Sequence, residues 1–299
     1  MSMGPLTRSD SPPRPQSLTK WLPAGIVLIL FSPILLSWIR FALGSDLYSY
    51  TILVPAISAY FAYSGKSSAG AGSGPKGAAW LLLAFGAALG IAYLILLNRS
   101  GDVIPQDRVS LGVLAFVSAL GGAIWLNATL AERSRLLFPL SFLIFMAPMT
   151  LGIEQRLETL LQHGSATPAY WLLRLVGTPV FRDDLIFQLP GMTLRIAPEC
   201  SGIRSTLVLF LTSIVAAKLF LRSPWRRAVL VAFVLPLALI RNGFRVFVIG
   251  ELCIHVGPHM IDSPIHHQGG PIFFALSLIP FGALAYILLR SDRKRSSAA

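Results

Sequence analysis

The chain has 299 residues, of which 54% are hydrophobic and only 13% are charged, and its mean hydropathy is +0.68. Soluble domains carry about 25% charged residues, so this composition excludes an ordinary soluble protein and indicates a polytopic membrane protein. The formal net charge of +12 requires no nucleic-acid partner, because basic residues gathered on one side of a membrane account for it.

In chain order, residues 1–20 are polar and rich in Pro and Ser, which predicts a disordered cytoplasmic N-terminus. Eight apolar runs follow, and most of them approach the length needed to cross a bilayer. They cover residues 21–39, 48–63, 77–97, 109–130, 136–153, 203–221, 227–250 and 271–289. We therefore expect an all-α fold, a polytopic membrane bundle of about eight transmembrane helices within residues 21–290. Residues 291–299 would form a basic cytoplasmic tail.

The segment between the fifth and sixth runs has a different pattern. Residues 154–177 carry apolar side chains at helical spacing among charged ones, which predicts an amphipathic helix along the membrane surface or over a site. Residues 178–197 alternate in polarity around Pro190 and Gly191, which indicates a small hairpin. Together they predict a small extracytoplasmic insertion before the sixth run.

The basic residues are distributed in a way that fits this arrangement. With a cytoplasmic N-terminus, the inside segments hold fourteen Lys and Arg residues and the short outside loops hold three. The long outside segment before the sixth run adds four, which carry less weight because the segment is long. This asymmetry is the usual signal for orientation in the cytoplasmic membrane. It predicts that both termini are cytoplasmic and that residues 198–202 face outward.

Cys200 stands where the polar stretch meets the sixth run. If Pro198 starts the helix, Cys200 lies in its first turn, where free N–H groups and the helix dipole favour the reactive thiolate. The alternative interpretation is that Cys200 is a small buried apolar residue. A disulfide with Cys253 is a further possibility, since both cysteines are expected in an oxidising space.

Polar groups also lie within the seventh run. Arg241, Asn242 and Arg245 are spaced to share one flank of a helix. An arginine within a membrane span is costly, so these residues are functional candidates. A transporter would also explain them, but it predicts a site at the membrane midplane and repeated halves.

Four of the five histidines lie in the loop after the seventh run, which leaves two chemistries open. One is acyl transfer by a cysteine, with a histidine as proton shuttle and an arginine that stabilises negative charge. The other is a metal-dependent intramembrane hydrolase, with His255 and His259 as ligands together with Asp262, His266 or His267. Pro258 disfavours a regular helix across the first pair, and the chain has no HExxH motif.

Three motifs in this order resemble the exosortase/archaeosortase family of membrane-embedded, sortase-like cysteine transpeptidases. They are residues 198–205 (PECSGIRS), 242–246 (NGFRV) and 266–270 (HHQGG). Upstream, Tyr48 and Ser49 followed by Leu53-Val54-Pro55 are similar to an early family stretch, although Tyr50 and Thr51 replace its His-Gly pair. The resemblance therefore covers most of the chain.

The resemblance implies Cys200, Arg245 and His266 as the catalytic residues. Supporting or alternative residues are Arg241, Asn242, His267, Arg204 and Glu199. It implies no metal and no organic cofactor. The expected substrates are surface or secreted proteins with PEP-CTERM-like C-terminal sorting tails, cleaved at the outer face of the cytoplasmic (inner) membrane and passed to an acceptor.

Overall fold

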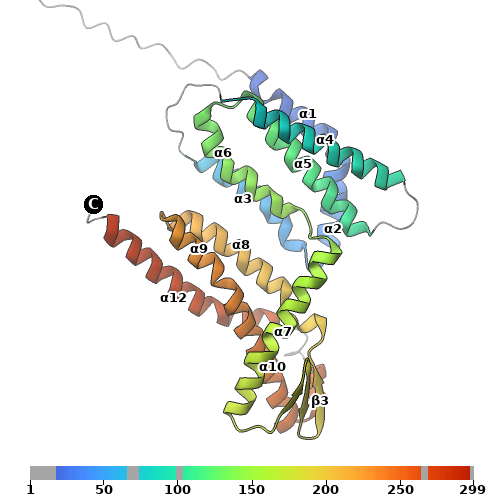
Figure 1. Cartoon of the computed structure of the whole chain (residues 1–299), viewed down its shortest axis with the longest axis vertical. Coiled ribbons are helices and arrows are strands. Elements are labelled where there is room, and N and C mark those ends of the chain that lie inside the picture. Colours follow the sequence, from blue (N-terminus) through green and yellow to red (C-terminus); the bar gives the residue numbers. More distant parts are fainter. Residues whose placement is uncertain (1–17, 66–73, 99–103, 264–268, 297–299) are drawn as a thin grey trace, which may run out of the picture. The chain divides into compact units, whose positions relative to one another are not determined.

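The computed structural model describes residues 18–65, 74–98, 104–263 and 269–296, and the chain divides into two compact units (Figure 1). The first unit consists of Met1–Gly44 and Thr51–Pro148. The second consists of Ser45–Tyr50 and Met149–Ala299. The short segment Ser45–Tyr50 therefore belongs to the second unit, although both of its sequence neighbours belong to the first.

The regular elements of the first unit are all helices. Its elements are η1 (Leu18–Trp21), α1 (Leu22–Leu30), α2 (Ser32–Gly44), η2 (Ser49–Ile52), α3 (Leu53–Ser64), α4 (Gly77–Asn98), α5 (Pro105–Asn127), α6 (Leu130–Phe142) and η3 (Leu143–Met146). The most extensive helix contact is between α4 and α5, where a Cβ on Gly86 would lie 3.0 Å from the Ala115 carbonyl oxygen and a Cβ on Gly122 would lie 2.8 Å from that of Ala79. Small side chains let two membrane helices approach closely, which is how such helices associate.

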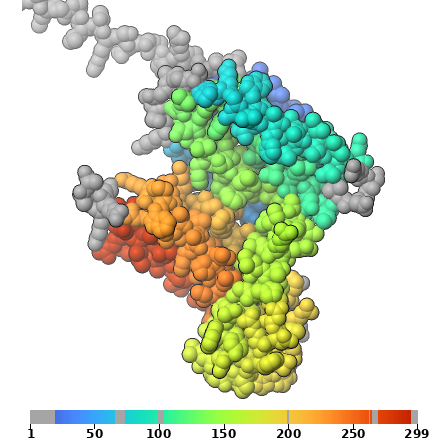
Figure 2. Space-filling view, viewed as in Figure 1, coloured from blue at the N-terminus to red at the C-terminus, as the bar shows by residue number. Residues whose placement is uncertain are grey.

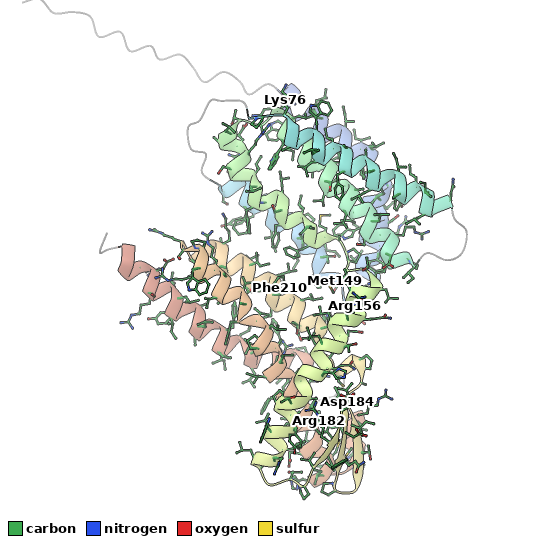
Figure 3. All side chains as sticks on the ribbon, viewed as in Figure 1. Lys76, Met149, Arg156, Arg182, Asp184 and Phe210 are labelled. Carbon is green, nitrogen blue, oxygen red and sulfur yellow. The ribbon has the colours of Figure 1, made fainter. Side chains whose placement is uncertain are left out.

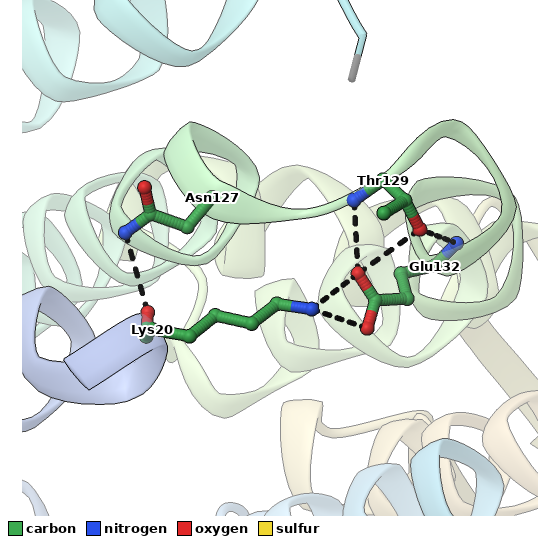
Figure 4. Close-up of polar contacts among 4 residues, drawn as sticks. All are labelled: Lys20, Asn127, Thr129 and Glu132. Atoms are coloured by element: carbon green, nitrogen blue, oxygen red, sulfur yellow. Dashed lines mark hydrogen bonds and ion pairs between the residues drawn. The ribbon is translucent and has the colours of Figure 1, made fainter. Parts of the chain in front are cut away.

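The start of α6 is fixed by a capping box. The Thr129 hydroxyl accepts from the backbone N–H of Glu132 at 3.3 Å, and the Glu132 carboxylate accepts from the backbone N–H of Thr129 at 2.8 Å. The Lys20 ammonium donates to the same carboxylate at 2.6 Å, and Asn127 donates to the Lys20 carbonyl at 3.3 Å (Figure 4). This network satisfies the free amides at the helix start and ties η1 to α6.

The second unit contains helices and a small sheet. Its elements after Ser45–Tyr50 are α7 (Leu151–Leu175), β1 (Phe181–Asp183), β2 (Ile186–Leu189), β3 (Met192–Arg195), η4 (Pro198–Cys200), α8 (Ile203–Phe220), α9 (Pro224–Ala232), α10 (Val234–His255), η5 (Pro258–Asp262) and α12 (Gly270–Ser296). The last helix continues through the basic residues expected to form a tail.

The three strands form an antiparallel sheet in the order β1-β2-β3. Pro190 and Gly191 lie at the turn between β2 and β3, in the place that the sequence pattern indicated. One face of the sheet packs against α7, as the yellow and yellow-green atoms show in Figure 2, and Phe187 is fully buried there. At the sheet edge, Arg182 donates to the Asp184 carbonyl at 2.8 Å and to the Thr167 hydroxyl of α7 at 3.1 Å (Figure 3).

Helices α7 and α10 make the most extensive helix–helix contact of the second unit. At their contact, a Cβ on Gly243 would lie 2.8 Å from the Ser165 carbonyl oxygen and 2.6 Å from the Pro168 ring. Only a residue without a side chain permits this approach. The close contact brings polar groups of α7 within reach of those on α10.

The described residues hold fewer helices that are long enough to span a membrane than the eight runs expected. Among the described residues, five helical segments are long and apolar enough to span, or up to seven if each of two bent pairs is one span. The run at 48–63 becomes η2 and α3, and the 12 residues of α3 reach only about 18 Å of the roughly 30 Å needed. The run at 136–153 is divided, because η3 ends at Met146 and α7 begins only at Leu151.

Candidate active site

Cys200 ends the short helical turn η4, and its backbone N–H donates to the Ala197 carbonyl at 2.9 Å. Ser201 and Gly202 follow before α8 begins at Ile203. The expectation that Cys200 lies in the first turn of the long helix is therefore wrong. Gly202 has a φ of 70° in the left-handed region, which separates the two helical segments.

Gly202 is enclosed by two side chains of α10. A Cβ at this position would lie 3.0 Å from the Asn242 Oδ1 and 3.2 Å from the Arg241 Nη2. A side chain here would meet both a backbone penalty and a steric one. The turn after Cys200 therefore requires glycine for two independent reasons.

Asn242 holds the backbone of Cys200 directly. Its side-chain nitrogen donates to the Cys200 carbonyl at 2.6 Å and to the Ser165 hydroxyl at 3.0 Å. Only 2% of Asn242 is exposed, and breaking a buried hydrogen bond leaves its partner unsatisfied. This amide therefore joins α7, α10 and η4 at the cysteine.

Arg241 forms hydrogen bonds to the residues that follow Cys200. Its Nη2 donates to the Gly202 carbonyl at 3.3 Å and to the Thr206 hydroxyl at 3.1 Å. The side chain is buried, and within the described residues its Nη1 has no hydrogen-bond partner. Arg241 thus contacts the backbone after the cysteine and the first turn of α8.

Arg245 lies one helical turn further along α10 and lines the same small cavity as Cys200. The cavity has a volume of about 20 Å³, which suits about one water molecule. Its lining residues are Leu194, Arg195, Ile196, Cys200, Arg245, Val246 and Ile249. A guanidinium beside a thiol favours the thiolate and can also stabilise an oxyanion.

Residues of α7 complete the surroundings of the cysteine. Gln162 is buried and donates to the Ile196 carbonyl at 3.3 Å, and Ser165 accepts from Asn242. Neither residue was among the site residues expected from the sequence. Their spacing of three residues on one face of an amphipathic helix, among buried Leu161 and Ala169, was the signal that could have indicated them.

The early segment Ser45–Tyr50 lies near the start of α7 and α8. The Tyr48 hydroxyl donates to the Glu154 carboxylate at 2.7 Å, and Arg204 lies 3.5 Å from the Ser49 hydroxyl. Burial, followed by the hydrogen bond to Glu154, raises the pKa of Tyr48. Burial and the charge of Glu154 raise the pKa of Tyr50 to about 12.

The sequence that builds this site matches one known protein family. The family model described as transmembrane exosortase (Exosortase_EpsH) matches residues 38–283, which is more than half of the chain. The chain belongs to the transmembrane exosortase family. No curated protein and no solved structure matches it.

Exosortase membership implies a membrane peptidase or transpeptidase of the protein-sorting type rather than a transporter. The matched region contains both Cys200 and Arg245, which the structure brings to one cavity. His266, His267 and the side chain of Glu199 lie outside the described residues. Their roles therefore remain predictions.

Two alternative interpretations, a disulfide between Cys200 and Cys253 and a metal site with histidine ligands, can be compared with the structure. Cys200 and Cys253 are both free thiols, so the disulfide interpretation is wrong for this structure. His255 lies 3.1 Å from the Glu251 carboxylate, which also accepts from the Thr178 hydroxyl. Across residues 18–65, 74–98, 104–263 and 269–296, no three His, Cys, Asp or Glu side chains are grouped to hold a metal.

Proposed function

We propose that this exosortase is a cysteine transpeptidase that removes a C-terminal, PEP-CTERM-like sorting tail from secreted proteins and transfers them to an acceptor. The observation that carries the proposal is the cavity lined by both Cys200 and Arg245 in a chain of this family. A nucleophile and a cation beside one space are the minimum requirement for acyl transfer.

The proposed reaction has two halves. The Cys200 thiolate attacks a backbone carbonyl carbon of the substrate, and Arg245 stabilises the oxyanion that forms. The C–N bond then breaks, His266 gives a proton to the leaving amine, and a thioester remains on the cysteine. An acceptor amine loses a proton to His266 and attacks the thioester carbonyl, and the C–S bond breaks to release the Cys200 thiolate.

The size of the cavity adds one requirement. A space of about 20 Å³ cannot hold a peptide carbonyl with its flanking residues, since it suits about one water molecule. Substrate must therefore displace side chains of the lining, and β3, which contributes Leu194 and Arg195, is the adjacent small element. In this proposal the sheet is part of the substrate entrance.

The proposal includes an outward-facing site with both termini in the cytoplasm. Its support is the excess of basic residues in the expected inside segments. Cys200 precedes α8 and Arg222 follows it, so the 18 residues of the helix separate them by about 27 Å. Accessibility labelling in intact cells tests this, and external labelling of cysteines introduced at residues 64–76 would contradict it.

The decisive experiment is co-expression with a candidate tailed substrate, followed by mass analysis of the substrate's new C-terminus. Cys200→Ala should fold normally and abolish cleavage, and Cys200→Ser should be almost as inactive because its hydroxyl is far less acidic. Cys253→Ala is the matched control and should remain active, since Cys253 is buried elsewhere on α10. Retained cleavage by Cys200→Ala would refute the proposal.

Two further measurements separate this chemistry from a metal-dependent one. A substrate adduct on Cys200, seen by mass spectrometry in a His266→Ala background, would directly support the thioester. A chelator should leave cleavage unchanged, and His255→Ala and His259→Ala should be active. Inactivation by chelator, with both histidine variants as impaired as His266→Ala, would instead support a metal-dependent hydrolase.

A further inference from the structure

A second cavity lies at the opposite end of α8 from Cys200. It has a volume of about 480 Å³ and lies where α8 ends, α9 begins and α12 approaches its last turn. Figure 1 shows the C-terminal end of α12 in red on the same side as the orange start of α9. The volume is within the range of roughly 300–1,000 Å³ that is usual for small-molecule sites.

The charged lining of this cavity is mostly positive. Four cationic side chains and one carboxylate line it: Lys218, Arg222, Arg227, Arg293 and Asp292. Cationic pockets at the ends of membrane helices attract phosphate groups of anionic lipids. The arrangement therefore points to a ligand with negative charge.

The single carboxylate is already occupied by protein groups. Asp292 accepts from the Arg226 guanidinium and from the backbone N–H of Arg222 at 2.6 Å. Ser223 contributes a longer backbone contact at 3.4 Å. Because Arg226 balances the charge of Asp292, the four other cations define the field in the cavity.

The fold holds the guanidinium of one of these residues and the backbone of another. Arg227 donates through its Nε to the Leu221 carbonyl at 2.8 Å, and the backbone of Arg222 is bound to Asp292. The floor of this region is apolar, since Leu221 and Leu230 are buried in the cluster that joins α8, α9 and α12. The basic groups therefore surround a buried apolar base.

Apolar side chains beside the cations distinguish between kinds of phosphate. Leu219 and Phe220 line the cavity and are about half exposed, and Trp225 on α9 is 74% exposed. Exposed Trp beside Arg is typical of the membrane–water interface. A free phosphate has no apolar part that could contact these side chains, whereas a phospholipid can place its acyl chains against them.

We propose that this cavity binds the phosphate headgroup of an anionic phospholipid, held by Lys218, Arg222, Arg227 and Arg293. The acyl chains lie against the exposed apolar surface at the end of α8. The site is separate from the candidate active site and does not depend on the proposed peptidase reaction. It anchors the α8–α9 turn and the end of α12 to one membrane leaflet.

The test uses the full-length protein purified in a neutral detergent and titrated with phosphatidylglycerol, with bound lipid counted by native mass spectrometry. Each cation near a lipid surface adds about fivefold to binding, so Arg293→Gln and Lys218→Gln should each weaken binding by about that factor. Both side chains are exposed, so neither change should unfold the protein. Arg290→Gln is the matched control, because Arg290 is an exposed cation on the same helix outside the cavity.

Two additional ligands test whether the bound phosphate belongs to a lipid headgroup or to a soluble molecule. Zwitterionic phosphatidylcholine should bind wild type more weakly than phosphatidylglycerol and should not distinguish the variants. Soluble glycerol 1-phosphate should compete poorly with the lipid. Equal phosphatidylglycerol binding by wild type, Arg293→Gln and Lys218→Gln would overturn the site, and full competition by glycerol 1-phosphate would overturn its assignment to a lipid.

Discussion

The side-chain nitrogen of Asn242 lies 2.6 Å from the backbone carbonyl oxygen of Cys200. These residues are 42 positions apart in the chain, and the contact connects the buried face of α10 to the turn that carries the candidate nucleophile. The same amide donates to Ser165 on α7. Three elements are therefore held together at the cysteine by one side chain.

Asn242→Ala should lower kcat for tail cleavage by tenfold or more and leave KM little changed, because the cysteine loses its fixed position while the substrate surface remains. Two buried hydrogen bonds are lost, so unfolding should become easier by about 1–3 kcal/mol. The rate of alkylation of Cys200 by iodoacetamide, in a Cys253→Ala background, gives an activity-independent measurement of the cysteine's environment.

Two further variants separate positioning from simple loss of stability. Asn242→Asp cannot donate to the Cys200 carbonyl and should be at least as impaired as Asn242→Ala. Ser165→Ala removes one acceptor and keeps the bond to Cys200, so its kcat should stay close to wild type. An Asn242→Ala variant with normal kcat and normal alkylation would show that the amide does not position the cysteine.

Gly202→Ala should destabilise the protein and lower its activity. The left-handed backbone costs an ordinary residue about 1–2 kcal/mol, and the new Cβ would press on Asn242 and Arg241. Gly191→Ala is the matched control, since Gly191 has a φ of 79° and a Cβ there would have nothing within 4 Å. Thermal unfolding should show the larger loss for Gly202→Ala, and equal losses would mean that packing at the turn contributes nothing.

Arg245→Lys should keep the fold and lose tail cleavage by about 100-fold or more, because a lysine cannot reproduce the guanidinium fork beside the thiol. Arg241→Lys should mainly lose stability, by about 1–3 kcal/mol, since it removes the bonds to Gly202 and Thr206. Cleavage assays and unfolding curves measured on the same preparations separate the two effects. Normal processing by Arg245→Lys with an inactive Arg241→Lys would reverse the assignment.

Stability should fall as the pH rises above 10. Burial and the charge of Glu154 raise the pKa of Tyr50 to about 12 from an ordinary value of 10.0. Between pH 10 and about 12 the unfolded chain has released the Tyr50 proton while the folded protein still holds it. Folding therefore becomes less favourable as the pH rises. The midpoint temperature of thermal unfolding, measured between pH 8 and 11.5, should fall less steeply with pH for Tyr50→Phe than for the wild type.

Tyr63→Phe is the control for this pH dependence, because Tyr63 is 92% exposed and lies outside the cluster around Glu154. It should follow the wild-type curve. If Tyr50→Phe and wild type lose stability in parallel, Tyr50 does not contribute to the alkaline transition.

Some features of the site follow from local patterns. The spacing of Arg241, Asn242 and Arg245 predicted that they share one flank of a helix. The structure places all three on α10, close to the turn that carries Cys200. Pro190 and Gly191 marked a turn through residues with strong backbone preferences. Such signals depend on neighbours in the sequence and can be recognised without the tertiary fold.

The placement of Cys200 could not be predicted in the same way. Pro198 correctly indicated a helical start, but the turn ends after three residues because Gly202 enters the left-handed region between two side chains of a distant helix. The length of α3 and the break between η3 and α7 were missed for a similar reason. Hydropathy describes how apolar a run is, not where its path changes direction.

The contact between Tyr48 and Glu154 has a consequence for the order in which the protein is made. The two residues are separated by 106 positions, and ribosomes add about 5–20 residues per second. Tyr48 therefore leaves the ribosome roughly 5–20 s before its partner exists. The translocation machinery must handle α1 to α6 while Ser45–Tyr50 still lacks the start of α7, so the second unit closes only late in synthesis.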